Sequence, residues 1–425
     1  MHLTSLLWTA PGGLHRRTIG GVLVALLATL LIAPAEATAR PDRDKPTPDR
    51  LDGTVRVATF NASLNRPGEG DLRRDLSTPK DQQARNVAEI IQRTRPDVLL
   101  LQEFDHDPEA PGLFSRNYLE RGQSGAEAIH YPYRFTAPVN TGVQTGFDLD
   151  RDGEVGGPGD AHGFGDFPGQ YGMVVYSKHP IDTERVRTFQ NQLWKDMPGA
   201  LLPTDPESGE SWYTSEELDV LRLSSKSHWD VPVRVGRRTV HVLASHPTPP
   251  VFDGPEDRNG LRNSDEIRFW KDYVSGPRTS RWIRDDAGRH GGLDARSSFV
   301  VAGDLNSDPH DGDSRPGSIG QLLEHPRVNT SVTPTSRGAL EESRVQGGVN
   351  LQHEGPPEHD TADFAEPPGN IRADYVLPSR DLRVRDAAVF WPTADDPLSR
   401  LTGEYPFPSS DHRLVWVDLE IARHR

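Results

Sequence analysis

The 425-residue sequence contains no cysteine. Disulfide bonds are therefore excluded, and the fold must be held by its apolar core and by any metal ions that it binds. Basic residues are in the minority, with 48 Lys and Arg against 63 Asp and Glu and a formal net charge of −15. A chain this acidic lacks the positive field of non-specific nucleic-acid binders. An anionic substrate would need a local cation to approach it, although the acidity is equally well explained by solubility.

The N-terminus carries an apolar stretch at residues 19–32, preceded by Arg16-Arg17 and followed by an A-x-A motif at residues 37–39. This pattern predicts a signal peptide over residues 1–39, cleaved near Ala39, and hence a secreted, extracellular protein. A membrane anchor is the alternative, but the stretch is short for a bilayer span. The two arginines suit both general and twin-arginine export. We expect no stable membrane span after processing.

The remaining chain is expected to form one domain. Residues 40–53 are rich in Pro, Asp and Arg and are interpreted as a flexible leader. Residues 54–425 show neither an internal repeat nor a break in composition. Apolar periodicity predicts strands at 55–60, 97–101, 172–177, 239–245, 299–302, 373–377 and 414–421, and helices at 81–94 and 263–274. Long loops rich in Gly, Pro and Asp are expected at 105–170, 190–230, 247–265 and 305–370. Turns are predicted at residues 253–254 and 258–260.

Polar motifs stand at the ends of several predicted strands. The motifs are Asn61, Gln102-Glu103, Ser245-His246-Pro247, Gly303-Asp304-Leu305-Asn306, Asp374 within 373–377, and Ser410-Asp411-His412. A rigid sheet can hold oxygen ligands and imidazoles at such positions for metal-assisted phosphate chemistry. A phosphoester-cleaving enzyme is therefore the leading hypothesis.

This ordered series resembles the motifs of the endonuclease/exonuclease/phosphatase superfamily, in the manner of a secreted bacterial member. The resemblance covers roughly residues 54–422. It implies the DNase I-like fold, a four-layer α/β sandwich of two packed mixed β-sheets flanked by helices. It also implies a magnesium-dependent hydrolase in which an activated water attacks a metal-bound phosphate. Phosphodiesterase, nuclease and phosphatase activities all remain open.

Three residues are expected near the metal. Glu103 resembles the family's magnesium-binding glutamate, and a carboxylate at a strand end suits Mg²⁺, which prefers oxygen ligands. Mn²⁺ is the second candidate. Asn61 would be a neutral oxygen ligand or would position the phosphate, and Asp411 would face the metal. An ordinary solvated acid is the alternative interpretation of Glu103.

Five residues are expected to carry the catalytic chemistry. His412 resembles the family's catalytic histidine, which takes a proton from water or stabilises the transition state, and Asp374 would orient it. Asp304 and Asn306 alternate along a segment predicted to be extended, so both would point to one face, where Asp304 aligns water and Asn306 donates to the phosphate. His246 would contact the phosphate or protonate the leaving oxygen. A turn at Asp304 to Asn306 and a packing role for His246 are the alternatives.

A separate acidic loop matches the opening of an EF-hand calcium loop. Its carboxylates are Asp148, Asp150 and Asp152, followed by Gly153 at the sixth position. The twelfth position departs from the pattern, because it is Gly159 instead of Glu. A structural Ca²⁺ site that orders this loop is one interpretation, and a solvated acidic loop is the other.

The expected partner is a phosphoester substrate, which could be nucleic acid, a small phosphoester or a lipid headgroup, and a monomer is expected. The sequence leaves open whether the ester is a monoester or a diester, and how many metal ions take part. An alternative function is a non-catalytic secreted protein that retains the fold and binds another molecule through calcium-stabilised loops.

Overall fold

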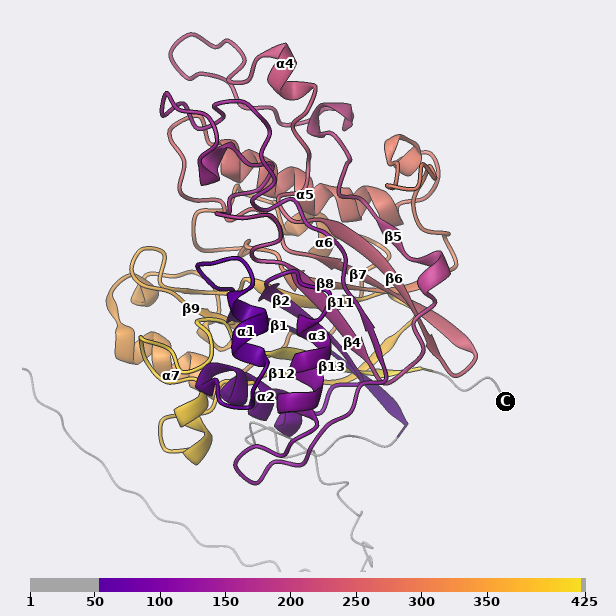
Figure 1. Cartoon of the computed structure of the whole chain (residues 1–425), viewed down its shortest axis with the longest axis vertical. Helices are drawn as coiled ribbons and strands as arrows, with labels where there is room; N and C mark the ends of the chain where they lie inside the picture. Colours follow the sequence, from indigo (N-terminus) through magenta and orange to yellow (C-terminus); the bar gives the residue numbers. More distant parts are fainter. Residues whose placement is uncertain (1–52, 422–425) are drawn as a thin grey trace, which may run out of the picture. The chain divides into compact units, whose positions relative to one another are not determined.

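The computed structural model describes residues 53–421. The predicted signal peptide and almost all of the predicted leader lie outside this range, so neither is tested here. Among the described residues, two mixed sheets pack together and are flanked by helices, which confirms the predicted α/β sandwich (Figure 1). No helix in residues 53–421 combines the length and apolar character needed to cross a bilayer.

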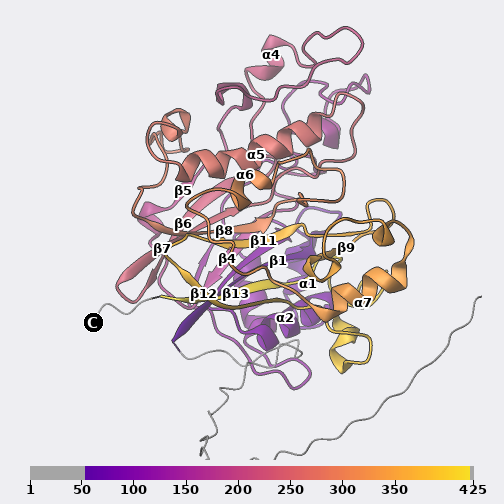
Figure 2. The same cartoon turned by 180° about the vertical axis from the view of Figure 1, so that it is seen from behind.

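The first sheet has six strands. In spatial order they are β12 (Arg383–Val389), β13 (Val415–Glu420), β1 (Thr54–Leu64), β2 (Val98–Phe104), β4 (Met173–Ser177) and β3 (Tyr133–Phe135). β1 and β2 run parallel, whereas β13 runs antiparallel to β1 and β4 antiparallel to β2. Seen from behind, β12 and β13 bring the C-terminal part of the chain to one edge of this sheet (Figure 2).

The second sheet has five strands. In spatial order they are β11 (Asp374–Pro378), β8 (Ser298–Asp304), β7 (Arg238–Ser245), β6 (His228–Val235) and β5 (Arg187–Thr188). β7 and β8 are parallel, and the other pairs are antiparallel. A separate two-stranded ribbon is formed by β9 (Ala362–Asp363) and β10 (Asn370–Ile371).

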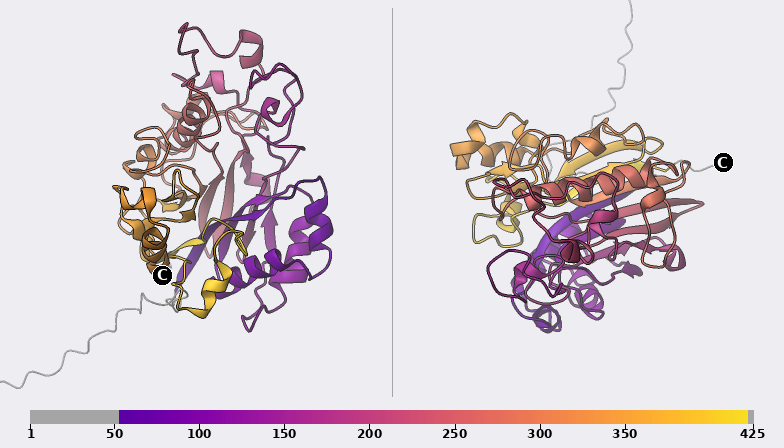
Figure 3. Two further views of the ribbon diagram at one scale, coloured as in Figure 1. Left: turned by 90° about the vertical axis from the view of Figure 1, so that its left-hand side faces the viewer. Right: turned by 90° about the horizontal axis from the view of Figure 1, so that it is seen from above.

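Helices cover the outer faces of both sheets. The α-helices are α1 (Asp71–Leu76), α2 (Gln82–Thr94), α3 (Ala110–Phe114), α4 (Ser215–Leu218), α5 (Arg258–Val274), α6 (Gly320–Leu323) and α7 (Arg337–Gln346). Short helical turns are η1 (Ser115–Leu119), η2 (Pro158–Asp160), η3 (Thr183–Arg185), η4 (Trp194–Asp196), η5 (Ser280–Trp282), η6 (Gly348–Leu351), η7 (Pro357–His359) and η8 (Pro397–Leu401). The indigo and purple helices α1 to α3 lie on one side of the paired sheets, and the rose helix α5 lies on the other (Figure 3).

The sequence of β2 shows why these layers form. Leu99 and Leu101 belong to the apolar cluster shared with α2, whereas Val98 and Leu100 belong to the cluster shared with the second sheet. Successive side chains of a strand point to opposite faces, so an uninterrupted apolar run buries both faces of the sheet. This run was correctly predicted as a strand.

α2 follows its predicted boundaries closely. Its N-cap is Asp81, whose carboxylate accepts a hydrogen bond of 2.8 Å from the backbone N–H of Ala84. At its other end Arg95 adopts a left-handed φ of 51°, directly before Pro96. Capping at the start stabilises the helix, and the proline after its end terminates it.

The prediction of turns at residues 258–260 was wrong, because α5 begins at Arg258 instead of Asn263. Asn and Gly are weak helix formers, but the local geometry favours them here. A Cβ on Gly260 would lie 2.1 Å from the Asp257 carboxylate, so a larger residue would require that side chain to move. The buried apolar side chains further along α5, among them Phe269 and Trp270, provide the packing that extends the helix.

Other elements lie in segments where no element was predicted. β6 starts inside the predicted loop 190–230, and α7 lies inside the predicted loop 305–370. β12 was not predicted at all, because Arg383, Arg385 and Asp386 interrupt its apolar pattern. β1 also continues past its predicted end at Asn61 to Leu64, with a shift in its pairing to β2 between these two residues.

His228, the first residue of β6, is fully buried and should make stability depend on pH. Its Nε2 bonds the carbonyl of Glu266 at 2.9 Å, and burial lowers its pKa to about 3. Between pH 6.5 and 3 the unfolded chain would bind a proton that the folded chain does not, so stability falls as pH falls. From pH 7 to pH 5 we expect a loss of about 2 kcal/mol. Denaturant unfolding of the wild type and of His228→Gln, whose pH slope should be smaller by up to one proton, measures this.

Candidate active site

The polar motifs of the sequence meet at one edge of the two sheets. β1 and β2 end there in the first sheet, and β7 and β8 end there in the second. β11 begins at the same edge, because Asp374 pairs with Asp304 in the β8–β11 ladder. Strand order and direction therefore bring together residues that are up to 351 positions apart, as between Asn61 and His412.

Glu103 lies at the end of β2 in a left-handed conformation with φ 52°. Its carboxylate accepts a hydrogen bond of 3.1 Å from the Asn61 amide. Burial, and then the negative charge of Asp411, raise the pKa of Glu103. Two partly buried carboxylates that repel each other would be stabilised by a cation between them.

Asn61 bridges two carboxylates. Its Nδ2 donates to Glu103 Oε1 and to Asp304 Oδ2, both at 3.1 Å, and its Oδ1 accepts from the backbone N–H of Ser63 at 3.2 Å. The side chain is completely buried. These contacts make Asn61 a positioning residue that fixes the two acids relative to each other. Its predicted role as a ligand remains a prediction.

His412 and Asp374 form a buried pair. The Nδ1 of His412 lies 2.8 Å from Asp374 Oδ2, and its Nε2 lies 3.5 Å from Asp304 Oδ2. Burial disfavours the charged imidazole, but Asp374 and then Asp304 outweigh it and raise the pKa of His412 well above its ordinary value. Burial raises the pKa of Asp374 to about 6. The pair therefore presents a positively charged imidazole near neutral pH.

Asp304 also contacts a second histidine. Its Oδ2 lies 3.3 Å from His246 Nε2. Burial, and then the charge of Lys226, lower the pKa of His246 to about 4, so this imidazole is neutral near pH 7. Burial opposes ionisation of Asp304, but the charge of His412 holds its pKa below the ordinary value. The His246 Nδ1 has no partner within residues 53–421.

The close approach of β7 and β8 depends on a glycine. A Cβ on Gly303 would lie 2.0 Å from the carbonyl oxygen of Ser245. Any larger residue would push these strands apart and separate Asp304 from His246, the residues that follow Gly303 and Ser245. The Gly-Asp pair in the sequence motif thus has a structural reason.

The predicted extended alternation from Asp304 to Asn306 was wrong. β8 ends at Asp304, and Asn306 adopts a left-handed φ of 49°. Its backbone N–H donates to Asp304 Oδ1 at 3.0 Å, which is the turn that was the alternative interpretation. The Asn306 Nδ2 donates to the Pro247 carbonyl at 3.1 Å. Asn306 still lines the site, although a turn and not a strand positions it.

A cavity of about 350 Å³ joins these groups. Six of the predicted site residues line it: Glu103, His246, Asp304, Asn306, Asp411 and His412. Asn61 and Asp374 contact lining residues through hydrogen bonds. The structure therefore brings together all eight residues that were predicted for the phosphate site.

Two sets of side chains at this cavity could hold a divalent cation. Glu103 and Asp411 offer carboxylate oxygens, which suit Mg²⁺. Asp304, Asp374 and His412 have ligand atoms within 4.8 Å of one another, but these atoms already form the contacts described above. We favour the first set because its carboxylates repel each other, whereas those of the second are balanced by an imidazole.

Thr361 is a site residue that sequence reasoning missed. Its hydroxyl donates to Asp374 Oδ2 at 2.8 Å and accepts the backbone N–H groups of Ala373 and Asp374. It therefore fixes the carboxylate that orients His412. A single threonine inside a predicted loop carries no signal that could have identified it.

The acidic loop predicted to bind calcium lies away from this cavity. One carboxylate oxygen from each of Asp148, Asp150 and Asp152 lies within 4.8 Å of the others. A Cβ on Gly159 would lie 2.0 Å from Asp150 Oδ2, so any other residue at the twelfth position would require the Asp150 carboxylate to move. Asp160 does not replace it, because its carboxylate accepts the backbone N–H groups of Leu149, Gly156 and Gly157. Calcium binding here remains a prediction.

If this loop binds calcium, the protein should become more stable in its presence. With a Kd of about 0.1 mM, 1 mM calcium would stabilise the folded state by about 1.4 kcal/mol. Thermal melting in chelator and in 1 mM calcium should show a higher Tm with calcium, and Asp150→Asn/Asp152→Asn should remove the difference. A wild-type melting curve that is the same in both conditions would exclude the site.

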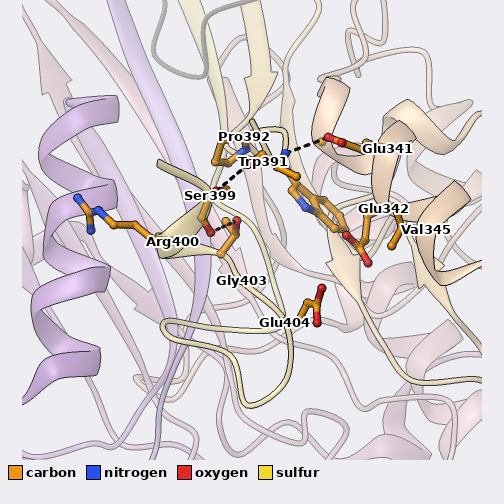
Figure 4. A pocket seen from close by; sticks show the side chains of 12 residues that line it. Glu341, Glu342, Val345, Trp391, Pro392, Ser399, Arg400, Gly403 and Glu404 are labelled. Carbon is orange, nitrogen blue, oxygen red and sulfur yellow. Dashed lines mark hydrogen bonds between the residues drawn. The ribbon is translucent and has the colours of Figure 1, made fainter. Parts of the chain in front are cut away.

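A second cavity, of about 480 Å³, lies between α7 and the segment that follows β12. It is lined by Glu341, Glu342, Trp391, Arg400 and Glu404, among others, and their side chains come from both walls (Figure 4). None of the residues predicted for the phosphate site lines it. The larger of these two cavities therefore does not contain the predicted catalytic and metal-binding residues.

Solved structures of related architecture resemble this chain at low identity. The endonuclease/exonuclease/phosphatase from Beutenbergia cavernae is 20% identical over 87% of this chain and 72% of that chain, with a TM-score of 0.48. Sphingomyelinase C from Streptomyces griseocarneus is 16% identical over 86% and 99% of the two chains, with a TM-score of 0.40. The human Nocturnin catalytic domain is 15% identical over 87% and 96%, with a TM-score of 0.42. No curated protein matches the chain.

The family model of the endonuclease/exonuclease/phosphatase family matches residues 58–412. This match runs from β1 to His412 and includes every residue described at the phosphate site. Members of this superfamily hydrolyse phosphoesters, and the two-sheet sandwich is the one that the family resemblance implied. The chain belongs to the endonuclease/exonuclease/phosphatase family.

Proposed function

We propose that the protein is a secreted, divalent-metal-dependent hydrolase of small phosphoesters. One observation carries this proposal: the Glu103 and Asp411 carboxylates and the His412 imidazole line the same cavity. A divalent cation held by Glu103 and Asp411 would offset the negative charge of the phosphate. Mg²⁺ is the expected ion and Mn²⁺ the alternative.

The other side chains have roles that follow from their charges. Asp304 is ionised and can accept a proton from an attacking water, as a general base. His412 is positively charged and can stabilise the negative charge that develops on the phosphate oxygens. Neutral His246 can bond the leaving oxygen. Asn306 keeps one amide N–H for the phosphate after donating the other to Pro247.

The charge of the cavity favours a substrate with a single phosphate. Its lining contains neither arginine nor lysine, and it includes three further acids, Asp308, Asp311 and Asp313. A polyanion such as duplex DNA binds by neutralising many phosphates with basic side chains, which this cavity does not offer. Apolar side chains including Val251, Phe252 and Phe364 also line it. We infer a small ester whose leaving group is neutral or cationic and partly apolar.

The place of action is also a proposal. The predicted signal peptide leads us to infer that the protein acts outside the cell after cleavage near Ala39, and we expect it to be a monomer. N-terminal sequencing of the protein recovered from the culture medium should begin shortly after Ala39. Recovery of the intact chain inside the cells only would contradict secretion.

A panel of substrates tests the activity. Chromogenic phosphodiesters and phosphomonoesters, sphingomyelin and plasmid DNA should be assayed side by side with Mg²⁺, with Mn²⁺ and with a chelator. We expect metal-dependent turnover of a small ester and slow or absent cleavage of plasmid DNA. Rapid plasmid cleavage would contradict the inferred substrate class. No turnover of any substrate would reject the enzyme and favour a non-catalytic binding protein.

A further inference from the structure

Lys226 is a buried lysine that none of the roles above uses. It lies two residues before β6, in a segment that was predicted to be a loop. In the β6–β7 ladder His228 pairs with Ser245, so Lys226 lies beyond the ladder at the same sheet edge as His246 and Pro247. Ser225 confirms this placement, because its hydroxyl donates to the His246 carbonyl at 3.4 Å.

The Lys226 side chain has no partner within residues 53–421. It is only 6% exposed, yet its ammonium makes neither a hydrogen bond nor an ion pair in that range. The nearby carboxylate of Glu266 already accepts the backbone N–H groups of Ser225 and Thr248, at 2.7 Å and 2.6 Å. A buried charge without a partner is costly for the folded state, so a purely structural role explains this lysine poorly.

A neighbouring cation shows the contrast. Arg262 is also buried, but its guanidinium donates to the carbonyl oxygens of His162, Arg222 and Leu223. Its Nε and Nη2 groups are therefore engaged by the protein itself. The ammonium of Lys226 has no comparable protein partner among residues 53–421.

Lys226 interacts electrostatically with residues of the phosphate site. Its positive charge lowers the pKa of both Glu103 and His246, although burial has the largest effect on each. In turn Glu266, Glu103 and Asp304 act on Lys226, whose pKa is lowered chiefly by burial. Together with the register of β6 and β7 and the Ser225–His246 hydrogen bond, these interactions place Lys226 behind the β7 side of the cavity, whose lining does not include it.

We propose that the ammonium of Lys226 binds a non-bridging oxygen of the substrate phosphate. This inference rests on the proposed function and names a further binding residue of that site. Lysine is a compact point charge with three donors and is well suited to a phosphate oxygen. The residues that line the cavity include acids but neither lysine nor arginine, so Lys226 would reach the phosphate from behind this lining and add a second positive charge to that of His412.

Binding of inorganic phosphate to Lys226→Met tests the proposal without requiring turnover. In calorimetry at saturating Mg²⁺, we expect phosphate affinity to fall by about 10- to 100-fold relative to wild type. The Tm should stay the same or rise, because the variant removes a buried unpaired charge. Lys226→Arg should retain part of the affinity. Lys195→Met, which removes a lysine paired with Asp219 at the surface, is the matched control and should bind phosphate normally.

Different outcomes separate this proposal from the proposed function. Phosphate affinity of Lys226→Met within twofold of wild type would overturn the role of Lys226, whatever the enzyme activity. Loss of affinity in a protein that turns over no substrate would retain the role of Lys226 and reject the hydrolase. If Lys226→Met does not fold, Lys226→Gln and Lys226→Arg allow the same comparison. Equal phosphate affinity in these two variants and the wild type would also overturn the proposal.

Discussion

Replacing His412 with alanine should lower kcat/KM for a small phosphoester by roughly 10³-fold. His412 lines the cavity, is held by Asp374 at 2.8 Å, and carries a positive charge near neutral pH. Alanine removes the group that would stabilise the developing phosphate charge. The measurement is steady-state hydrolysis with Mg²⁺ for the wild type and the variant, with circular dichroism to show that both are folded.

A histidine outside the site provides the matched control. His130 is 68% exposed and pairs with Glu120, so His130→Ala should keep wild-type activity. Asp374→Asn should lose activity almost as far as His412→Ala, because it leaves the imidazole without its orienting carboxylate. Equal activity of His412→Ala and the wild type would reject the assignment of His412.

Replacing Glu103 with glutamine should weaken Mg²⁺ binding by at least about 100-fold. Residues that only support metal ligands already cost 10- to 100-fold in affinity when they are mutated, and Glu103 is proposed to be a direct ligand. Glutamine keeps the size of the side chain and can still bond Asn61, but it removes one of two negative charges. Titration calorimetry of both proteins with Mg²⁺, in the absence of substrate, measures the effect.

Asp374→Asn separates the two sets of side chains that could hold the cation. If Glu103 and Asp411 hold it, Asp374→Asn should bind Mg²⁺ like the wild type while losing activity. If Asp304, Asp374 and His412 hold it instead, Asp374→Asn should lose Mg²⁺ binding and Glu103→Gln should keep it. The second result would move the metal and contradict our assignment.

Much of the fold could be predicted from local sequence pattern. α2 was predicted within one residue of its boundaries, and β2 within one residue at its start and three at its end, because an amphipathic segment and an apolar run have local physical causes. The same holds for the strands that end at Ser245 and Asp304. Their ends carry the polar motifs, so their convergence at one sheet edge follows from strand direction once the sheets form.

Elements stabilised by distant contacts could not be predicted in this way. β12 contains Arg383, Arg385 and Asp386 and is a strand because it pairs with β13. The start of α5 contains Asn and Gly and is helical because of tertiary packing. Local propensity is a weak guide wherever such contacts decide the conformation.

The same distinction applies within the candidate site. His412, Asp374 and Glu103 stand in motifs whose residue types indicate their chemistry. Thr361 and Lys226 have no such motif, and they belong to the site only because the fold places loop segments beside Asp374 and His246. The left-handed turn at Asn306 likewise depends on its own contacts with Asp304 and Pro247. Residues that support a site are therefore harder to find from sequence than residues that act in it.

A crystal structure of the wild-type protein with Mg²⁺ and inorganic phosphate would test the central claim most directly. We predict Mg²⁺ at about 2.1 Å from carboxylate oxygens of Glu103 and Asp411. The phosphate should lie between this ion and the imidazole of His412. Mg²⁺ bound elsewhere, or a phosphate that contacts neither the ion nor His412, would contradict the account.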